Sequence, residues 1–252
     1  MIEICALASG SNGNCYYIGN ENEAILIDAG INCKQILLRM TAVGLDPLKV
    51  KAVFITHEHV DHICGTKVFC NKHTIPGFFT PGTYYNASHD HRPKLYSFLQ
   101  TGQSFNFGAF TIHAFSKNHD SAEPCSFRVE IEDVSISVLT DIGTPCKNVT
   151  DHLKESDILF LETNYDEKML WEGNYTWPLK KRIASDHGHL SNVQAYNLVN
   201  DNANGRLKTI FLSHLSGENN KPEIAVEVFS TLNEKYRIIC TSRHQPSELI
   251  KV

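Results

Sequence analysis

Short apolar runs separated by turn residues recur along the whole chain and predict a protein rich in β-strands. The first three runs, residues 2–8, 15–18 and 24–27, are joined by Gly- and Asn-containing turns and predict an antiparallel meander. Further strands are predicted at residues 50–55, 94–99, 104–107, 110–115, 126–131, 134–139, 158–161, 210–212 and 237–240. Apolar residues at helical spacing predict helices from Asn32 or Cys33 to Val43, and at residues 62–72, 192–199 and 222–232. This order indicates two β-rich halves, each finished by helices, and an α+β fold of stacked sheets covered by helices.

Length and composition fit one soluble globular domain over residues 1–252. No apolar run approaches the roughly 20 residues that span a bilayer, so no membrane partner is expected. The first residues, Met1–Cys5, lack the basic region of a signal peptide. None of the eight cysteines forms a C-x-x-C pair, which predicts free thiols in a reducing, cytoplasmic compartment.

Side chains that can bind metal follow the predicted strands. The segment His57-x-His59-x-Asp61-His62 comes directly after the strand at 50–55, and His119, Asp141 and His214 follow later strands. Imidazole and carboxylate suit zinc, manganese or iron. Since alternate residues of a tight loop project to one side, His57 and His59 can share one ion, whereas Asp61 and His62 point to a second. Polar groups held on loops by a rigid sheet are typical of a functional site.

The segment Thr56-His57-x-His59-x-Asp61-His62 resembles the signature of the metallo-β-lactamase superfamily. This resemblance implies a four-layer αβ/βα sandwich with a binuclear centre. It assigns His57, His59 and His119 to one metal and Asp61, His62 and His214 to the other, with Asp141 as the bridge. Asp28, in Ile25–Gly30, resembles the aspartate that supports the metal loop through hydrogen bonds. The resemblance thus implies two divalent ions, zinc or manganese, with iron as a further option.

Three segments distinguish branches of the superfamily. Leu7–Asn14, Leu161–Asp166 and the pair Ser185–Asn192 with His214–Asn220 resemble the YycJ (WalJ) family, which is related to ribonuclease Z. His59 stands where flavodiiron proteins have glutamate, which argues against that redox branch. Glyoxalase-type thioesterases share all seven ligands, so the ligands alone leave that alternative open.

Resemblance to ribonuclease Z assigns the protonation of the leaving oxygen to His189 rather than to His187. We therefore assign catalytic roles to Asp61 and His189. Ser216, Asn219 and Asn220 are candidate phosphate-binding residues, with loop-stabilising hydrogen bonds as the alternative. Two further hypotheses are that backbone N–H groups of residues 9–14 bind an anion and that the basic residues 180–182 contact phosphate.

The sequence as a whole predicts a phosphodiesterase, most specifically a DNA nuclease resembling 5′-exonucleases. In the expected mechanism a metal-bridging hydroxide attacks phosphorus. The formal net charge of −5 provides no general basic field for nucleic acid, but two ions add about four positive charges where the phosphate binds. The 72 residues between Asp141 and His214 are expected to hold two helices and no cap domain. The alternatives are a thioesterase or other small-molecule hydrolase, and a non-catalytic module that binds metal or nucleic acid; the oligomeric state stays open.

Overall fold

The computed structural model describes residues 1–252, which divide into two compact units. Unit 1 comprises Met1–Gln103, Ser121–Cys125 and Ser242–Val252, and unit 2 comprises Ser104–Asp120 and Ser126–Thr241. Each unit contains one seven-stranded sheet. The single domain over residues 1–252 stays a prediction. No helix is both long and apolar enough to cross a membrane.

The sheet of unit 1 has the strand order β14-β1-β2-β3-β4-β5-β6. Strands β1, β2 and β3 form the predicted antiparallel meander, and β3, β4, β5 and β6 run parallel to one another. The strands are β1 (Glu3–Ala8), β2 (Cys15–Gly19), β3 (Ala24–Ile27), β4 (Val50–Phe54), β5 (Gly77–Phe79), β6 (Tyr96–Phe98) and β14 (Ile250–Lys251). The helices are α1 (Cys33–Ala42), α2 (Val60–Ile63), α3 (Thr66–His73) and α4 (Pro81–Asn86), with a 3₁₀ turn at Pro47–Lys49. The parallel part therefore brings the carboxyl ends of four strands to one edge.

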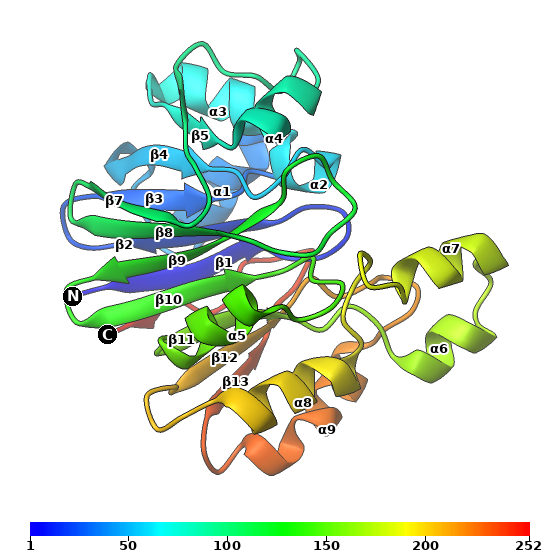
Figure 1. Ribbon diagram of the computed structural model, residues 1–252. Coiled ribbons are helices and arrows are strands. Elements are labelled where there is room, and N and C mark those ends of the chain that lie inside the picture. Colours follow the sequence, from blue (N-terminus) through cyan, green and yellow to red (C-terminus); the bar gives the residue numbers. More distant parts are fainter. The chain divides into compact units, whose positions relative to one another are not determined.

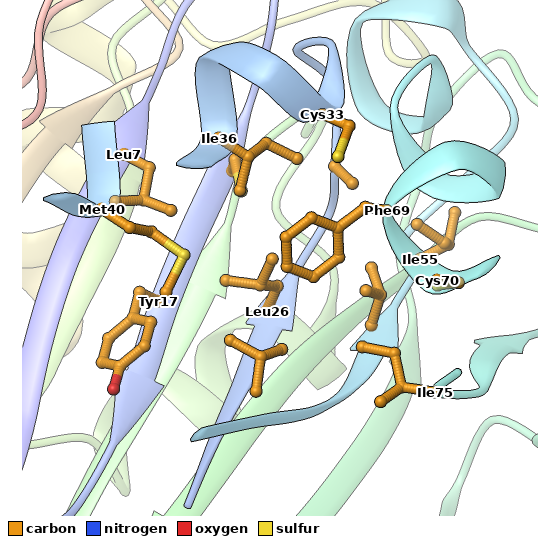
Figure 2. Close-up of a cluster of buried hydrophobic side chains, with 14 of the residues drawn as sticks. Leu7, Tyr17, Leu26, Cys33, Ile36, Met40, Ile55, Phe69, Cys70 and Ile75 are labelled. Carbon is orange, nitrogen blue, oxygen red and sulfur yellow. The ribbon is translucent and has the colours of Figure 1, made fainter. Parts of the chain in front are cut away.

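The core of unit 1 lies between the sheet and helices α1 and α3 (Figure 2). Ile36 and Met40 project from one face of α1 at the helical i, i+4 spacing, and Phe69 projects from α3. They pack on Leu7, Tyr17 and Leu26, which line one face of the strands. Burying these apolar side chains stabilises the unit by about 1.5–3 kcal/mol per large residue. The strands that carry the loops at the edge are thereby held rigidly.

Unit 2 has the strand order β13-β12-β11-β10-β9-β8-β7, in which β10, β11, β12 and β13 are parallel. The strands are β7 (Gln103–Phe107), β8 (Phe110–Ser116), β9 (Cys125–Ile131), β10 (Val134–Leu139), β11 (Ile158–Glu162), β12 (Thr209–Ser213) and β13 (Arg237–Cys240). The helices are α5 (Lys147–Lys154), α6 (Glu167–Glu172), α7 (Trp177–Ile183), α8 (Asn192–Asn202) and α9 (Pro222–Val228), with a 3₁₀ turn at Ser230–Leu232. Apolar residues of α5, α8 and α9 cover one face of this sheet (Figure 1).

Three helical expectations were wrong. The helix expected at 62–72 is divided into α2 and α3 around Gly65. The N–H of Gly65 donates to the carbonyl of Ala29 at 2.8 Å and not to the preceding helical turn, and this close approach of the loop interrupts the helix. The interval between Asp141 and His214 holds four helices, α5 to α8, rather than two. The expected helix at 222–232 ends at Val228 and continues only as a 3₁₀ turn.

Candidate metal centre

The metal-competent residues of unit 1 lie at the carboxyl ends of two neighbouring parallel strands. Asp28 follows β3 directly, and Thr56 and His57 follow β4 after one residue. Asp28 adopts a left-handed backbone conformation with φ 61°. Non-glycine residues rarely adopt this conformation, which recurs at functional sites because packing enforces it there. The turn directs the carboxylate of Asp28 at the loop after β4.

Asp28 organises this loop through hydrogen bonds. Its Oδ1 accepts the backbone N–H of Thr56 at 2.8 Å, and its Oδ2 accepts the Thr56 hydroxyl at 2.9 Å and Nδ1–H of His62 at 2.7 Å. The Thr56 oxygen in turn accepts Nδ1–H of His57 at 2.9 Å. Both histidines are consequently protonated on Nδ1 and keep the lone pair on Nε2, which is the form that binds a metal ion.

The four donors His57, His59, Asp61 and His62, called here the first donor group, lie close together. Nε2 of His57 is 3.1 Å from Nδ1 of His59, and Nε2 of His62 is 3.5 Å from Oδ2 of Asp61. Two ring nitrogens that approach each other in this way are suited to share one cation. The donor chemistry therefore fits a metal ion.

The glycine-rich segment after β1 supports the first donor group. Asn14 donates its backbone N–H to the carbonyl of Asp61 at 2.8 Å, and its side-chain amide lies 3.1 Å from Nε2 of His62. Gly30 closes the contact from the other side, since a Cβ there would lie 1.7 Å from the Asp61 carbonyl oxygen. The backbone N–H groups of Ser9, Gly10, Gly13 and Asn14 are all donated within the protein. These bonds oppose the hypothesis that residues 9–14 bind an anion; the segment braces the metal loop.

Unit 2 presents a second donor group, His119, Asp141 and His214. Asp141 and His214 follow β10 and β12, and His119 follows β8. Oδ1 of Asp141 is 3.3 Å from Nε2 of His214 and 3.8 Å from Nε2 of His119. Asp141 and His214 have φ 55° and 57°, so they share the left-handed conformation of Asp28. Three of the strand-end residues predicted from the sequence thus occupy the same unusual backbone state.

The protonation of His119 also suits metal binding. Its Nδ1 donates to the carbonyl of Gly188 at 3.2 Å, which leaves the lone pair on Nε2 facing Asp141. Burial lowers the pKa of His119 to about 3, despite the nearby charge of Asp141, which raises it. The ring is therefore neutral at physiological pH, as a ligand must be.

Glu162, at the end of β11, belongs to the site although sequence reasoning gave it no role. Its buried carboxylate accepts the backbone N–H of Ile142 at 2.7 Å and that of Leu190 at 3.2 Å, and its other oxygen lies 2.7 Å from Nδ1 of His189. Nδ1 of His189 is 3.8 Å from Asp141, and the ring stacks on His214 with centroids 5.3 Å apart. The position after a strand, which singled out the other residues, was the available signal. His187 is exposed and lies outside this arrangement.

Comparison with known proteins shows the family of this chain. The family model described as the metallo-beta-lactamase superfamily matches residues 8–146. This chain belongs to the metallo-β-lactamase superfamily. Exodeoxyribonuclease WalJ of Streptococcus pneumoniae is 34% identical over 226 residues, which cover 87% of this chain and 83% of that protein. Exodeoxyribonuclease YycJ of Bacillus anthracis is 32% identical over 238 residues, which cover 93% and 90%. The predicted membership of the YycJ (WalJ) branch is thereby confirmed.

The fold of this superfamily member is also that of a solved structure. The metallo-beta-lactamase fold protein YhfI from Bacillus subtilis superposes with a TM-score of 0.76 over 100% of both chains, at 15% sequence identity. This likeness confirms the expected α+β, metallo-β-lactamase-type fold.

Two side chains of this metallo-β-lactamase-fold chain that were predicted to contact substrate, Ser216 and Asn220, form hydrogen bonds within the protein. The Asn220 amide donates to the carbonyls of Thr163 and Asn164 at 2.8 and 3.2 Å, and its oxygen accepts from Asn192 and Lys221. The Ser216 hydroxyl oxygen accepts the N–H groups of Glu218 and Asn219 at 3.3 and 3.1 Å. These bonds favour the loop-stabilising alternative for Asn220 and Ser216. The buried amide nitrogen of Asn219 makes no such bond.

The basic cluster at residues 180–182 is likewise occupied. Lys180 is buried and donates to the carbonyl of Trp171 at 2.7 Å, and Arg182 is paired with Asp120. Lys181 lies over the ring of Trp177 at 5.5 Å. All three cations therefore have partners within the protein, which argues against this cluster as a main phosphate contact.

Proposed function

We propose that this chain is a binuclear metal-dependent phosphodiesterase that degrades DNA as an exonuclease from the 5′ end. The exodeoxyribonuclease activity is the one named for its relatives from S. pneumoniae and B. anthracis, whereas the two metals and the 5′ polarity come from the resemblance of the sequence motifs. One observation within the site carries it: the pairing of His189 with the buried Glu162 beside two metal-competent residues, Asp141 and His214.

The resemblance to the superfamily implies seven ligands for the proposed binuclear centre, which would come from the two donor groups. In this proposal His57, His59 and His119 would hold one ion, Asp61, His62 and His214 would hold the other, and Asp141 would serve both. Divalent ions bound there, zinc or manganese with iron as a further option, supply a nucleophile at neutral pH and neutralise charge on the phosphoryl oxygens. The chain's own contribution is to fix the ligands in position through Asp28, Thr56 and Asn14.

His189 provides the proton that a departing alkoxide needs. Glu162 accepts Nδ1–H of His189, so it orients the ring and stabilises the imidazolium that carries the second proton on Nε2. A thiolate leaves without such help because thiols are far stronger acids than alcohols. The His189–Glu162 pair therefore favours a phosphodiester over the thioester of the alternative function.

Two assays test this proposal. Bis-p-nitrophenyl phosphate and a glutathione thioester are compared as substrates with zinc and with manganese; turnover of the thioester alone would overturn the phosphodiesterase assignment. DNA strands labelled at the 5′ or the 3′ end then report polarity, in single- and double-stranded form and beside matched RNA. A 5′-exonuclease releases the 5′ label at once as a short product, whereas the 3′ label is retained on a shortening series.

A cytoplasmic location belongs to the same proposal. It is supported by the eight cysteines, which are all free. Free thiols persist in reducing compartments and are rare in oxidising ones.

A further inference from the structure

Four aromatic rings form a cluster on the surface of unit 1, called here the aromatic patch: Tyr84, Tyr85, Tyr96 and Phe98. Tyr84 stacks on Tyr96 with centroids 4.3 Å apart, and Phe98 lies 5.5–5.7 Å from Tyr84, Tyr85 and Tyr96. Tyr85 is 64% exposed, and Tyr96 and Phe98 are each 45% exposed. Such a gathering of large exposed rings marks an interaction site.

The fold holds this patch along the last strand of a sheet. Tyr96 and Phe98 are two residues apart on β6, the last strand of the unit 1 sheet, so their side chains project from the same face. Tyr84 and Tyr85 come from α4, whose end is fixed by Arg92. The Arg92 guanidinium donates to the carbonyls of Tyr85 and Ala87 at 2.8 and 2.7 Å and lies over the Tyr84 ring. The rings are therefore presented by a rigid frame.

The surroundings of the patch are basic in an acidic protein. Residues 63–103 carry four Lys or Arg residues and one acid, Asp90, and Glu123, which contacts α4, adds one more acid beside them, whereas the whole chain has a formal net charge of −5. Lys72 and Lys94 are exposed, and Lys67 donates to the carbonyl of His89 in the turn before Arg92. This charge is complementary to a polyanion. It opposes pairing with a second copy of the chain, which would bring like charges together.

The patch is also linked to the first donor group within unit 1. Strands β4, β5 and β6 are parallel, so Phe98 and the loop after β4 lie at the same edge, two strands or about 10 Å apart. Glu123 accepts the N–H of Gly82 in α4 at 2.6 Å, and its carbonyl accepts the hydroxyl of Thr80. The adjoining residue Ala122 donates its N–H to Glu58 of the metal loop at 2.8 Å. One short segment thus ties the metal loop to the helix that carries two of the rings.

We propose that the aromatic patch binds an unpaired nucleic-acid strand, which it holds by stacking bases on Tyr85 and Phe98 while Lys94 attracts the phosphates. Base stacking needs exposed π-faces and a nearby cationic surface, and both are present. A duplex keeps its bases stacked inside and cannot use the rings in this way. The inference rests on the proposed function, since it describes where the strand next to the hydrolysed end is held.

Binding of a fluorescent, hydrolysis-resistant phosphorothioate oligothymidylate, followed by anisotropy with the metal-loaded protein, tests the proposal. We expect the single strand, whether this probe or matched oligouridylate, to bind more tightly than the corresponding duplex. Phe98→Leu and Tyr85→Leu keep apolar bulk but remove a ring, and each should weaken binding on the order of 5- to 150-fold. Phe98→Tyr retains the ring and should bind within about twofold of the unmodified protein.

Charge is tested separately through salt. Lys94→Glu should reduce the slope of log affinity against log salt concentration by about 0.7, the contribution of one phosphate contact on a single strand. Lys34→Glu, an exposed lysine on α1, is the matched control and should leave the slope unchanged.

Three results would overturn the inference: no binding of the oligonucleotide by the unmodified protein, equal affinity of the leucine variants, or a concentration-dependent dimer that Phe98→Leu abolishes. Hydrolysis of bis-p-nitrophenyl phosphate by the unmodified protein is measured alongside. Its absence would count against the proposed function and would leave the binding result to be judged by itself.

Discussion

Replacing Glu162 by glutamine should slow DNA hydrolysis without removing the metal ligands. The glutamine oxygen can still accept the N–H groups of Ile142 and Leu190, which places its NH₂ group against Nδ1 of His189. Nδ1 must then accept rather than donate, so the ring keeps a hydrogen bond but changes tautomer and loses the carboxylate that stabilises its imidazolium. A hydrogen bond to a charged group contributes about 1.5–3 kcal/mol. The rate should consequently fall by about 10- to 150-fold.

The choice of substrate makes this prediction specific. The leaving group of DNA hydrolysis is an alkoxide, which needs a proton. The leaving group of bis-p-nitrophenyl phosphate is p-nitrophenolate, which departs without a proton near neutral pH. We therefore expect turnover of DNA to show the full loss and turnover of the nitrophenyl ester to change by less than about threefold. Metal content, measured by mass spectrometry, should be unchanged.

Glu167→Gln is the matched control, because Glu167 accepts the hydroxyl of Ser191 and contacts no histidine in the same unit. This variant should hydrolyse DNA and the nitrophenyl ester at unchanged rates. Equal losses on DNA and on the nitrophenyl ester in Glu162→Gln, or loss of metal from that variant, would refute the proton-donor role assigned to His189.

Three further predictions concern metal, packing and pH. Asp141→Ala should lower both metal content and turnover, whereas His189→Ala should lower turnover alone; equal metal loss in metal analysis would contradict these roles. Gly30→Ala should push the Asp61 carbonyl aside and destabilise the fold by about 1–3 kcal/mol in thermal unfolding, whereas Gly205→Ala, with open space at its Cβ, should not. Burial, helped by Arg128 and His113 against the opposing charges of Asp151 and Glu130, lowers the pKa of His152 from 6.5 to about 4. As the pH falls, the unfolded chain binds this proton at a higher pH than the folded chain does. The contribution of neutral His152 to the free energy of unfolding is therefore complete above about pH 6.5. It is lost as the pH falls towards 4, by at most about 3 kcal/mol. His152→Gln should flatten that part of the stability curve; an unchanged slope would exclude the assignment.

Much of the fold could be predicted because strand signals are local. The runs at 24–27, 134–139 and 237–240 were located at their observed bounds, since alternating or continuous apolar residues ended at turn residues. The elements β5, β14, α4, α5, α6 and α7 were missed. They are short, and α4 begins with Pro81 and Gly82, so their conformation depends on tertiary contacts such as the bond from Gly82 to Glu123.

In the candidate site, too, residues close in sequence could be recognised and contacts between distant residues could not. The spacing of His57, His59 and His62 is visible within six residues, and it indicated a metal site at once. Glu162 and His189 are 27 residues apart, and Asn14 and His62 are 48 apart, so their contacts exist only after the strands have been brought to one edge. The proton-donor pair and the brace of the metal loop therefore could not be recognised from spacing.

The left-handed conformations of Asp141 and His214 set chemical activity against stability. Glycine adopts that conformation at no steric cost, whereas other residues lose about 1–2 kcal/mol, and burial of the Asp141 carboxylate adds a further cost. A library of this chain selected for resistance to heat in a metal-free medium should therefore accumulate glycine at position 141, and to a lesser degree at 214, and lose activity as it does so. The same selection with metal present should retain Asp141. The bound ion then stabilises the buried carboxylate and offsets the unfavourable left-handed backbone conformation.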